Sequence, residues 1–314
     1  MLSRLASSLF RLGQLAERAD HVARVLDVHA ALALDGSEPR DRTFWAGLET
    51  LLGAPHNSEA EFRSTVDGLV IGDHARSIRA SVQGARRAAQ SVRPSLSSEA
   101  FECINSLHWE LDESDRHHDL HEFLIRTQRG IQLLWGLVDD SMSHDQAWDF
   151  LRLGKYLERS GNVTRLVTGK LAEQAGAEPG EWAAVLRCCS AFEAYRWKFS
   201  AAVTPERVAG FLLLEPSLPR SAAHCVNEAL DSVRRVDPPG AQSQPHRLLG
   251  RLASLLSYTV PEELAADPGG FSSAFTALHG ALRDSLYSTY FRPSRVPSRA
   301  SVPAPAWAQP QQQQ

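Results

Sequence analysis

The stretch FRLGQLAERADHVARV, residues 10–25, is followed by a similar one, LRLGKYLERSGNVTRL, residues 151–166. Aligned without a gap, the two agree at seven of sixteen positions. The identical pairs are Arg11/Arg152, Leu12/Leu153, Gly13/Gly154, Glu17/Glu158, Arg18/Arg159, Val22/Val163 and Arg24/Arg165. Helix propensity alone would not supply a shared glycine, because glycine is a poor helix former. We interpret the pair as an internal duplication.

Two later correspondences extend the repeat. The sequence VDGLV at 66–70 matches VAGFL at 208–212, and Arg76-Ser77 matches Arg220-Ser221. The chain is therefore expected to contain two similar halves, residues 1–127 and 143–292. The alternative is that two ordinary amphipathic helices coincide by chance.

Apolar residues recur at helical spacing along most of the chain, and proline, glycine and capping residues divide it. The pattern predicts an all-α bundle of about ten to twelve helices and no strand. Ser58/Glu61 and Ser143/Gln146 are expected to form capping boxes at two helix starts. The expected helices cover about 3–34, 43–52, 58–71, 75–92, 98–115, 118–140, 144–174, 181–201, a short helix from 205, 220–236, 244–258 and 271–291.

The last residues differ in composition from the rest of the chain. Residues 293–314 are rich in Pro, Ser, Ala and Gln and end in PQQQQ. Such a segment lacks the apolar residues needed for a core. We expect one helical domain over residues 1–292 and a disordered tail over 293–314.

Composition narrows the function classes. The chain has 314 residues and a net charge of -4, which argues against a nucleic-acid binder with a strongly basic face. No apolar run is long enough to cross a bilayer, so no membrane partner is expected. The four cysteines show no metal-binding or disulfide spacing, and no secretory signal is visible. A reduced, cytoplasmic protein is the simplest interpretation.

Sequence motifs for known chemistry are missing. We find no phosphate-binding loop, dinucleotide fingerprint or nucleophile elbow. His117 and His121 have chelating helical spacing, but no third ligand is specified, so a polar loop or helix start is favoured over a metal site. The Glu-x-x-His signature of di-iron bundles does not occur. We expect no metal and no cofactor held by the chain itself.

The repeated helices carry a polar face. Gly13, Glu17, Asp20 and Arg24 share one side of the first helix. Gly154, Glu158, Gly161 and Arg165 occupy the equivalent side of the second. This face could be solvated, with weak surface ion pairs. It could instead be a polar seam, in which glycine allows close approach and Glu and Arg form charge-assisted hydrogen bonds. A catalytic role for Glu17 or Glu158 is a third possibility.

Several separated blocks resemble one bacterial family, the alpha-E domain family. They lie, in the right order, at 1–28, 148–166, 191–199, 207–221, 247–252 and 286–291. The resemblance covers about residues 1–292 and implies an all-helical fold. Members are typically encoded beside, or fused to, a circularly permuted ATP-grasp protein, and often near a transglutaminase-like protein. The resemblance, through these neighbouring genes, implies a role in ATP-dependent amide or peptide bond formation, with ATP and Mg²⁺ bound by the partner ligase.

Three functions stay open on this basis. The leading hypothesis is an accessory or co-catalytic subunit that docks on an ATP-grasp ligase or binds its substrate. The second is a stand-alone enzyme that uses the Glu/Arg seam for acid–base chemistry, and the third is a structural scaffold. The candidate substrate- or partner-binding residues are Gly13, Glu17, Arg18, Arg24, Gly154, Glu158, Arg159 and Arg165.

Overall fold

A computed structural model describes residues 3–35, 42–55, 61–113, 119–173, 179–200 and 202–292. Within these ranges the chain is helical, with fourteen α-helices and no strand. The helices are α1 (Ser3–Asp35), α2 (Arg42–Leu52), α3 (Phe62–Ile71), α4 (Ile78–Ser91), α5 (Ser98–Glu113), α6 (Leu120–Ser141), α7 (Gln146–Ala172), α8 (Pro179–Cys188), α9 (Phe192–Phe199), α10 (Pro205–Leu214), α11 (Ala222–Val236), α12 (Gln244–Tyr258), α13 (Pro261–Ala266) and α14 (Pro268–Leu286). A short 3₁₀ turn covers Arg93–Ser95, and a π-helical turn covers Tyr287–Phe291.

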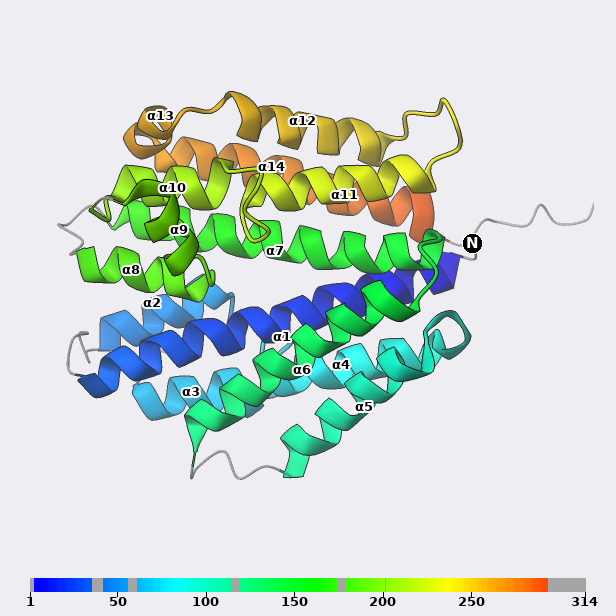
Figure 1. Cartoon of the computed structure of the whole chain (residues 1–314), viewed down its shortest axis with the longest axis horizontal. Coiled ribbons are helices and arrows are strands. Elements are labelled where there is room, and N and C mark those ends of the chain that lie inside the picture. Colours follow the sequence, from blue (N-terminus) through cyan, green and yellow to red (C-terminus); the bar gives the residue numbers. More distant parts are fainter. Residues whose placement is uncertain are drawn as a thin grey trace, which may run out of the picture.

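The two repeat helices, α1 and α7, form the centre of the bundle (Figure 1). Helix α1 packs against α4 and α6, and α5 packs on both of these. Helix α7 packs against α11 and α14, and α12 packs on both of these. The long helices α1 and α7 are thus the layer that joins the lower group in the figure, α3–α6, to the upper group, α10–α14.

The starts of α4 and α11 explain why the Arg-Ser pairs recur. Ser77 caps α4 by accepting a hydrogen bond from the backbone N–H of Ala80, and Ser221 caps α11 in the same way from His224. The arginine that precedes each capping serine is therefore held at the start of a helix that packs on a repeat helix. VDGLV and VAGFL both lie in helices, α3 and α10, as expected.

Four differences from the sequence-based expectation concern a helix break, an extra helix and the caps of two helices. The expected helix 181–201 is two helices, because Ser190 has a left-handed backbone with φ 50° and separates α8 from α9. The short helix α13 was not expected. These two differences raise the helix count to fourteen from the ten to twelve expected. Asp145, not Ser143, caps α7, because its carboxylate accepts from the N–H groups of Ala147 and Trp148.

The start of α3 is the fourth difference. Its capping box uses Glu61 with Ser64, so Glu61 is the capping residue and not the third residue of the helix. Ser58, the other residue of the expected box, lies outside the described residues, as do His117 and the tail 293–314. No described helix has both the length and the apolar character that crossing a membrane requires.

Candidate functional site

Helices α1 and α7 touch backbone to backbone where they cross. A Cβ atom added to Gly13 would lie 2.0 Å from the carbonyl oxygen of Leu151, and one added to Gly154 would lie 2.0 Å from that of Phe10. Only glycine fits at either position, since real Cβ contacts are not that short. Phe10 and Leu151 are themselves an aligned pair of the repeat, so the contact is reciprocal. It brings the next turns of the two helices together.

One turn beyond the glycines, each Glu-Arg pair meets the other. The carboxylate of Glu17 accepts from Nε and Nη2 of Arg159, both at 2.6 Å. The carboxylate of Glu158 accepts from Nε of Arg18 at 2.8 Å and from Gln14 at 2.9 Å. Each glutamate thus pairs with the arginine of the other helix, not with its own neighbour. Because Glu17 and Glu158 are only 1% and 8% exposed, these ion pairs lie inside the bundle.

The arginines also hold the loops that precede α4 and α11. Arg18 donates to the carbonyl oxygen of Ala75 at 3.2 Å, and Arg159 donates to that of Pro219 at 3.4 Å. The next residue in each loop is an arginine that contacts one of the glutamates. A guanidinium nitrogen of Arg76 lies 3.2 Å from a carboxylate oxygen of Glu158, and one of Arg220 lies 3.7 Å from a carboxylate oxygen of Glu17. These paired contacts favour the duplication hypothesis, which stays a prediction.

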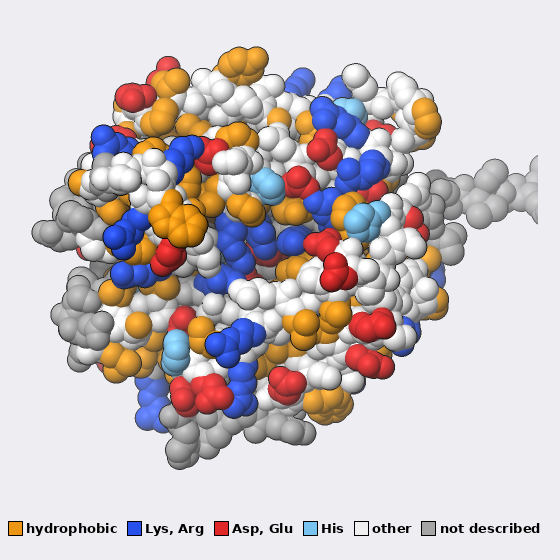
Figure 2. Space-filling view, in the orientation of Figure 1, with side chains coloured by type: hydrophobic (Ala, Val, Ile, Leu, Met, Phe, Trp, Pro, Cys, Tyr) orange, Lys and Arg blue, Asp and Glu red, His pale blue; other side chains and the backbone are white. Residues whose placement is uncertain are grey.

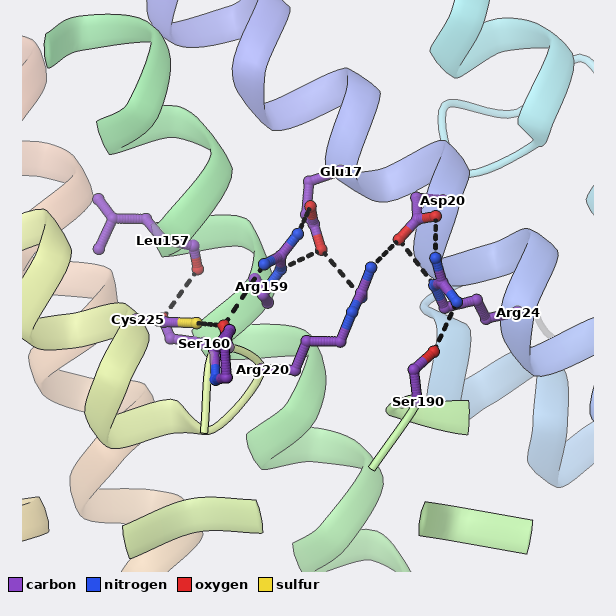
Figure 3. A network of polar contacts seen from close by, with 10 residues as sticks. Glu17, Asp20, Arg24, Leu157, Arg159, Ser160, Ser190, Arg220 and Cys225 are labelled. Atoms are coloured by element: carbon purple, nitrogen blue, oxygen red, sulfur yellow. Dashed lines mark hydrogen bonds and ion pairs between the residues drawn. The ribbon is translucent and has the colours of Figure 1, made fainter. Parts of the chain in front are cut away.

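On one side of the crossing a second carboxylate completes the pairing (Figure 3). Asp20 accepts two hydrogen bonds from Arg24, both at 2.9 Å, and one from Arg220 at 2.8 Å. Arg24 also donates to the hydroxyl of Ser190 at 2.6 Å. The left-handed turn between α8 and α9 therefore presents Ser190 to this group. We call it the Glu17 cluster; its members are Glu17, Asp20, Arg24, Arg159, Ser190 and Arg220.

The other side lacks that second carboxylate. The residue aligned with Asp20 is Gly161, and the residue aligned with Arg24 is Arg165. Arg165 donates to the side-chain oxygen of Asn162 at 2.6 Å, while its Nε is buried without a hydrogen-bond partner. We call this side the Glu158 cluster; its members are Gln14, Arg18, Arg76, Glu158 and Arg165.

The pKa values follow from these neighbours. Burial alone would raise the pKa of Glu158, but Arg18 and Arg76 hold it at about 2. Burial likewise opposes ionisation of Asp20, and Arg220 and Arg24 still hold its pKa well below the usual range. Burial, and next to it the charge of Arg165, lowers the pKa of His21 to about 3. Glu158 and Asp20 are therefore charged and His21 is neutral at neutral pH.

The two motif glutamates suit binding better than proton transfer. A general acid or base works best when its pKa is near the working pH, and Glu158 is far from it. Glu17 has both oxygens occupied by one guanidinium group. Burial lowers the pKa of Lys155 to about 8, and this amine stacks 4.3 Å from the ring centre of Trp135. Figure 2, drawn in the orientation of Figure 1, shows Lys and Arg side chains gathered in a hollow between the lower and the upper group of helices.

The structure brings all eight candidate residues to the α1–α7 crossing or within three turns of it. The solvated-face interpretation is wrong, because Glu17, Asp20 and Arg24 are all at most 7% exposed. Sequence analysis left five contributors out of the candidate set: Asp20, which it placed on the polar face, and Gln14, Ser190, Arg76 and Arg220. The last two carried a signal in the repeated Arg-Ser pair, whereas Ser190 carried none.

Metal ligands do not gather around this crossing. Within the ranges that the structure describes, no three His, Cys, Asp or Glu side chains are placed to hold a metal ion. His121, one of the two histidines weighed as a chelating pair, lies 2.6 Å from Asp27.

Comparison with known proteins agrees with the resemblance. A family described as a predicted alpha-helical domain with a conserved ER motif, Alpha-E, matches residues 1–291. Two uncharacterized proteins, one of Mycobacterium tuberculosis strain H37Rv and one of Mycobacterium bovis, are each 27% identical over 90% of this chain. The chain spans 36% of the length of these relatives.

No solved structure matches the chain significantly. The chain has three ER pairs, Glu17-Arg18 and Glu158-Arg159 at the crossing and Glu206-Arg207 in α10. With its family model matched over residues 1–291, the chain belongs to the Alpha-E family.

Proposed function

We propose that the chain is an accessory subunit of an ATP-dependent system that forms amide or peptide bonds, with an ATP-grasp protein as its partner. In this role it binds the ligase or an anionic group of its substrate. ATP and Mg²⁺ belong to the ligase, and both proteins act in the cytoplasm. A transglutaminase-like protein is a further candidate partner.

The observation that carries this proposal is the way the motif glutamates are used. Each is buried and bound by an arginine of the opposite helix, at 2.6 Å for Glu17 and 2.8 Å for Glu158. This removes the two best candidates for acid–base catalysis. What is left is positive charge: arginines outnumber carboxylates in both clusters. Arginine is well suited to carboxylate and phosphate groups, because its planar donors match their geometry.

A scaffold is the second candidate, and the Glu17 cluster favours it. Every ionised group of that cluster has an opposite charge within reach. The Glu158 cluster does not fit a pure scaffold equally well, because Arg165 keeps a buried Nε without a partner. A scaffold would need no such group, since an unpaired buried donor lowers stability.

Association with the ligase tests the proposal. The tagged chain is mixed with the ATP-grasp protein encoded nearest to it, and both binding and ATP-dependent product formation are measured. We expect a complex, and product formation that rises when the chain is added. Turnover by the chain alone without ATP would support the stand-alone enzyme instead. A scaffold predicts association with no change in ligase activity, and failure to associate would contradict the proposal.

A further inference from the structure

The missing carboxylate at Gly161 leaves Arg165 in an unusual position. Its counterpart Arg24 is held by Asp20, four residues earlier on the same helix. Among the described residues no carboxylate lies within ion-pair distance of Arg165, whose bond goes to the neutral side chain of Asn162. Arg165 is half-buried and its Nε is fully buried. A guanidinium withdrawn from water normally has an anionic partner, because an unpaired buried charge is strongly unfavourable.

The neighbours of Arg165 increase this shortage of negative charge. Glu158 is the carboxylate that acts on both Arg76 and Arg165, while Arg18 and Arg283 repel both. Burial and these repulsions lower the pKa of Arg76 and of Arg165. His279 adds no charge at neutral pH, because burial lowers its pKa even though the contact of its Nε2 with the carbonyl oxygen of Leu157, at 3.1 Å, acts in the opposite direction. Glu158 thus forms ion pairs with Arg18 and Arg76, and Arg165 and Arg283 add positive charge nearby.

A cavity of about 860 Å³ adjoins this group, and Arg165 is part of its wall. Helices α1, α2, α7, α8 and α14 form the wall, with His29 as the contribution of α1. The wall is largely apolar, with Phe44, Leu48, Leu51, Leu166 and Val185. Its other charged members on α7 and α8 are paired with one another, since Lys170 lies 2.7 Å from Glu173 and 3.0 Å from Glu181. Among the described residues of this wall, Arg165 is thus the Lys or Arg side chain that has no carboxylate partner.

We infer that this cavity binds an organic anion with an apolar body, whose carboxylate or phosphate group meets Arg165. The apolar part would lie along α2, α7 and α8, where it replaces water against aliphatic and aromatic side chains. The volume falls within the usual range for small-molecule sites. The inference deepens the proposed function by naming the class of group that the chain holds, and it rests on that function only for the ligand's role.

Binding can be tested on the purified chain alone, without the ligase. Anilinonaphthalene sulfonate, which joins an apolar ring system to an anionic group, serves as the fluorescent probe. Decanoate, decyl phosphate and decanol then compete for the site. We expect decanoate or decyl phosphate to displace the probe at concentrations roughly tenfold or more below decanol. The stronger of the two identifies the anionic group, and equal displacement by decanol would overturn the inference.

The substitution Gly161→Asp is the sharpest variant, because it restores the carboxylate found in the first repeat. A Cβ at Gly161 has room, with its nearest neighbours, two ring atoms of His279 and Nη1 of Arg165, at 3.6–3.7 Å. The new carboxylate should occupy Arg165 and weaken probe and decanoate binding about tenfold, without unfolding the protein. Two neutral variants, Gly161→Asn and Gly161→Ala, are the matched controls. Their affinities for the probe and for decanoate should agree within about twofold.

Two more variants separate charge from volume. Gly47→Leu projects into the cavity wall, where an added Cβ meets no atom within 4 Å, and should weaken all three competitors by filling space. Arg165→Gln should weaken the two anions alone, whereas Arg251→Gln, at an exposed position of α12, should leave their binding unchanged. If Gly161→Asp and Arg165→Gln both bind decanoate like the unaltered chain, the site is not at Arg165. Loss of ligase association with intact decanoate binding would refute the proposed function and leave this inference standing.

Discussion

The backbone contact between α1 and α7 at Gly13 predicts how the variant Gly13→Ala changes stability. The added methyl carbon would lie 2.0 Å from the carbonyl oxygen of Leu151, whereas ordinary contact begins near 3.4 Å. The atoms nearest to the added carbon, the carbonyl group of Leu151 and the amide nitrogen of Lys155, belong to the helix backbone and cannot rotate away as a side chain could. The helices α1 and α7 must separate by roughly 1 Å, a shift comparable to the margin within which a hydrogen bond is lost.

That shift would act directly on the buried ion pair one turn away. The two bonds between Glu17 and Arg159 are 2.6 Å long and would stretch or break. Overpacking a core costs about 1–3 kcal/mol, and disrupting a buried charge pair adds to this. We expect Gly13→Ala, and its counterpart Gly154→Ala, to lower the free energy of unfolding by about 3 kcal/mol or more.

The assay is urea unfolding followed by far-UV circular dichroism. Gly136→Ala in α6 is the control, because a Cβ there meets no atom within 4 Å. Alanine is a better helix former than glycine, so this control should stabilise the protein by about 0.5–1 kcal/mol. The reasoning is refuted if Gly13→Ala unfolds at the same urea concentration as the control.

Two further predictions concern charge and backbone strain. Because the pKa of Glu158 is lowered from 4.5 to about 2, its ion pairs should contribute fully above pH 4.5 and be lost as the pH falls towards 2. Glu158→Gln should therefore have a lower free energy of unfolding than the unaltered chain at pH 7, and this difference should disappear in acid. Urea unfolding at several pH values measures the difference. A difference that grows as the pH falls would contradict the lowered pKa of Glu158. Ser200 ends α9 with φ 44°, so Ser200→Gly should stabilise the protein by about 1 kcal/mol, read from thermal unfolding, and no gain there would argue against a left-handed cap.

Much of the fold was accessible from the sequence, for identifiable physical reasons. Helix α1 was expected from 3 to 34 and runs from 3 to 35, because its apolar spacing and the following Gly36 and Pro39 are strong local signals. The break at Ser190 has no such signal. A serine adopts the left-handed conformation there because its hydroxyl meets Arg24, a contact between residues 166 positions apart.

The seam was predictable as a set of residues but not as a set of bonds. Gly13, Glu17 and Arg18 recur in the second copy, which pointed to this face. Neighbouring side chains on a helix point in different directions, so the sequence leaves open which arginine each glutamate meets. The cavity beside Arg165 was not foreseen, since its wall combines residues of five helices between positions 29 and 273. The sequence gives one sign of the site: the position aligned with Asp20 in the second repeat stretch is Gly161, so that Arg165 has no aspartate four residues before it.

The central claim is that each glutamate of the two ER pairs at the crossing binds the arginine of the other helix. Double-mutant cycles on urea unfolding test it most directly, with Glu17→Gln combined with Arg159→Gln in one cycle and with Arg18→Gln in the other. The claim predicts a coupling energy of about 2 kcal/mol for Glu17 with Arg159 and almost none for Glu17 with Arg18. A larger coupling between the sequence neighbours Glu17 and Arg18 than between Glu17 and Arg159 would contradict it.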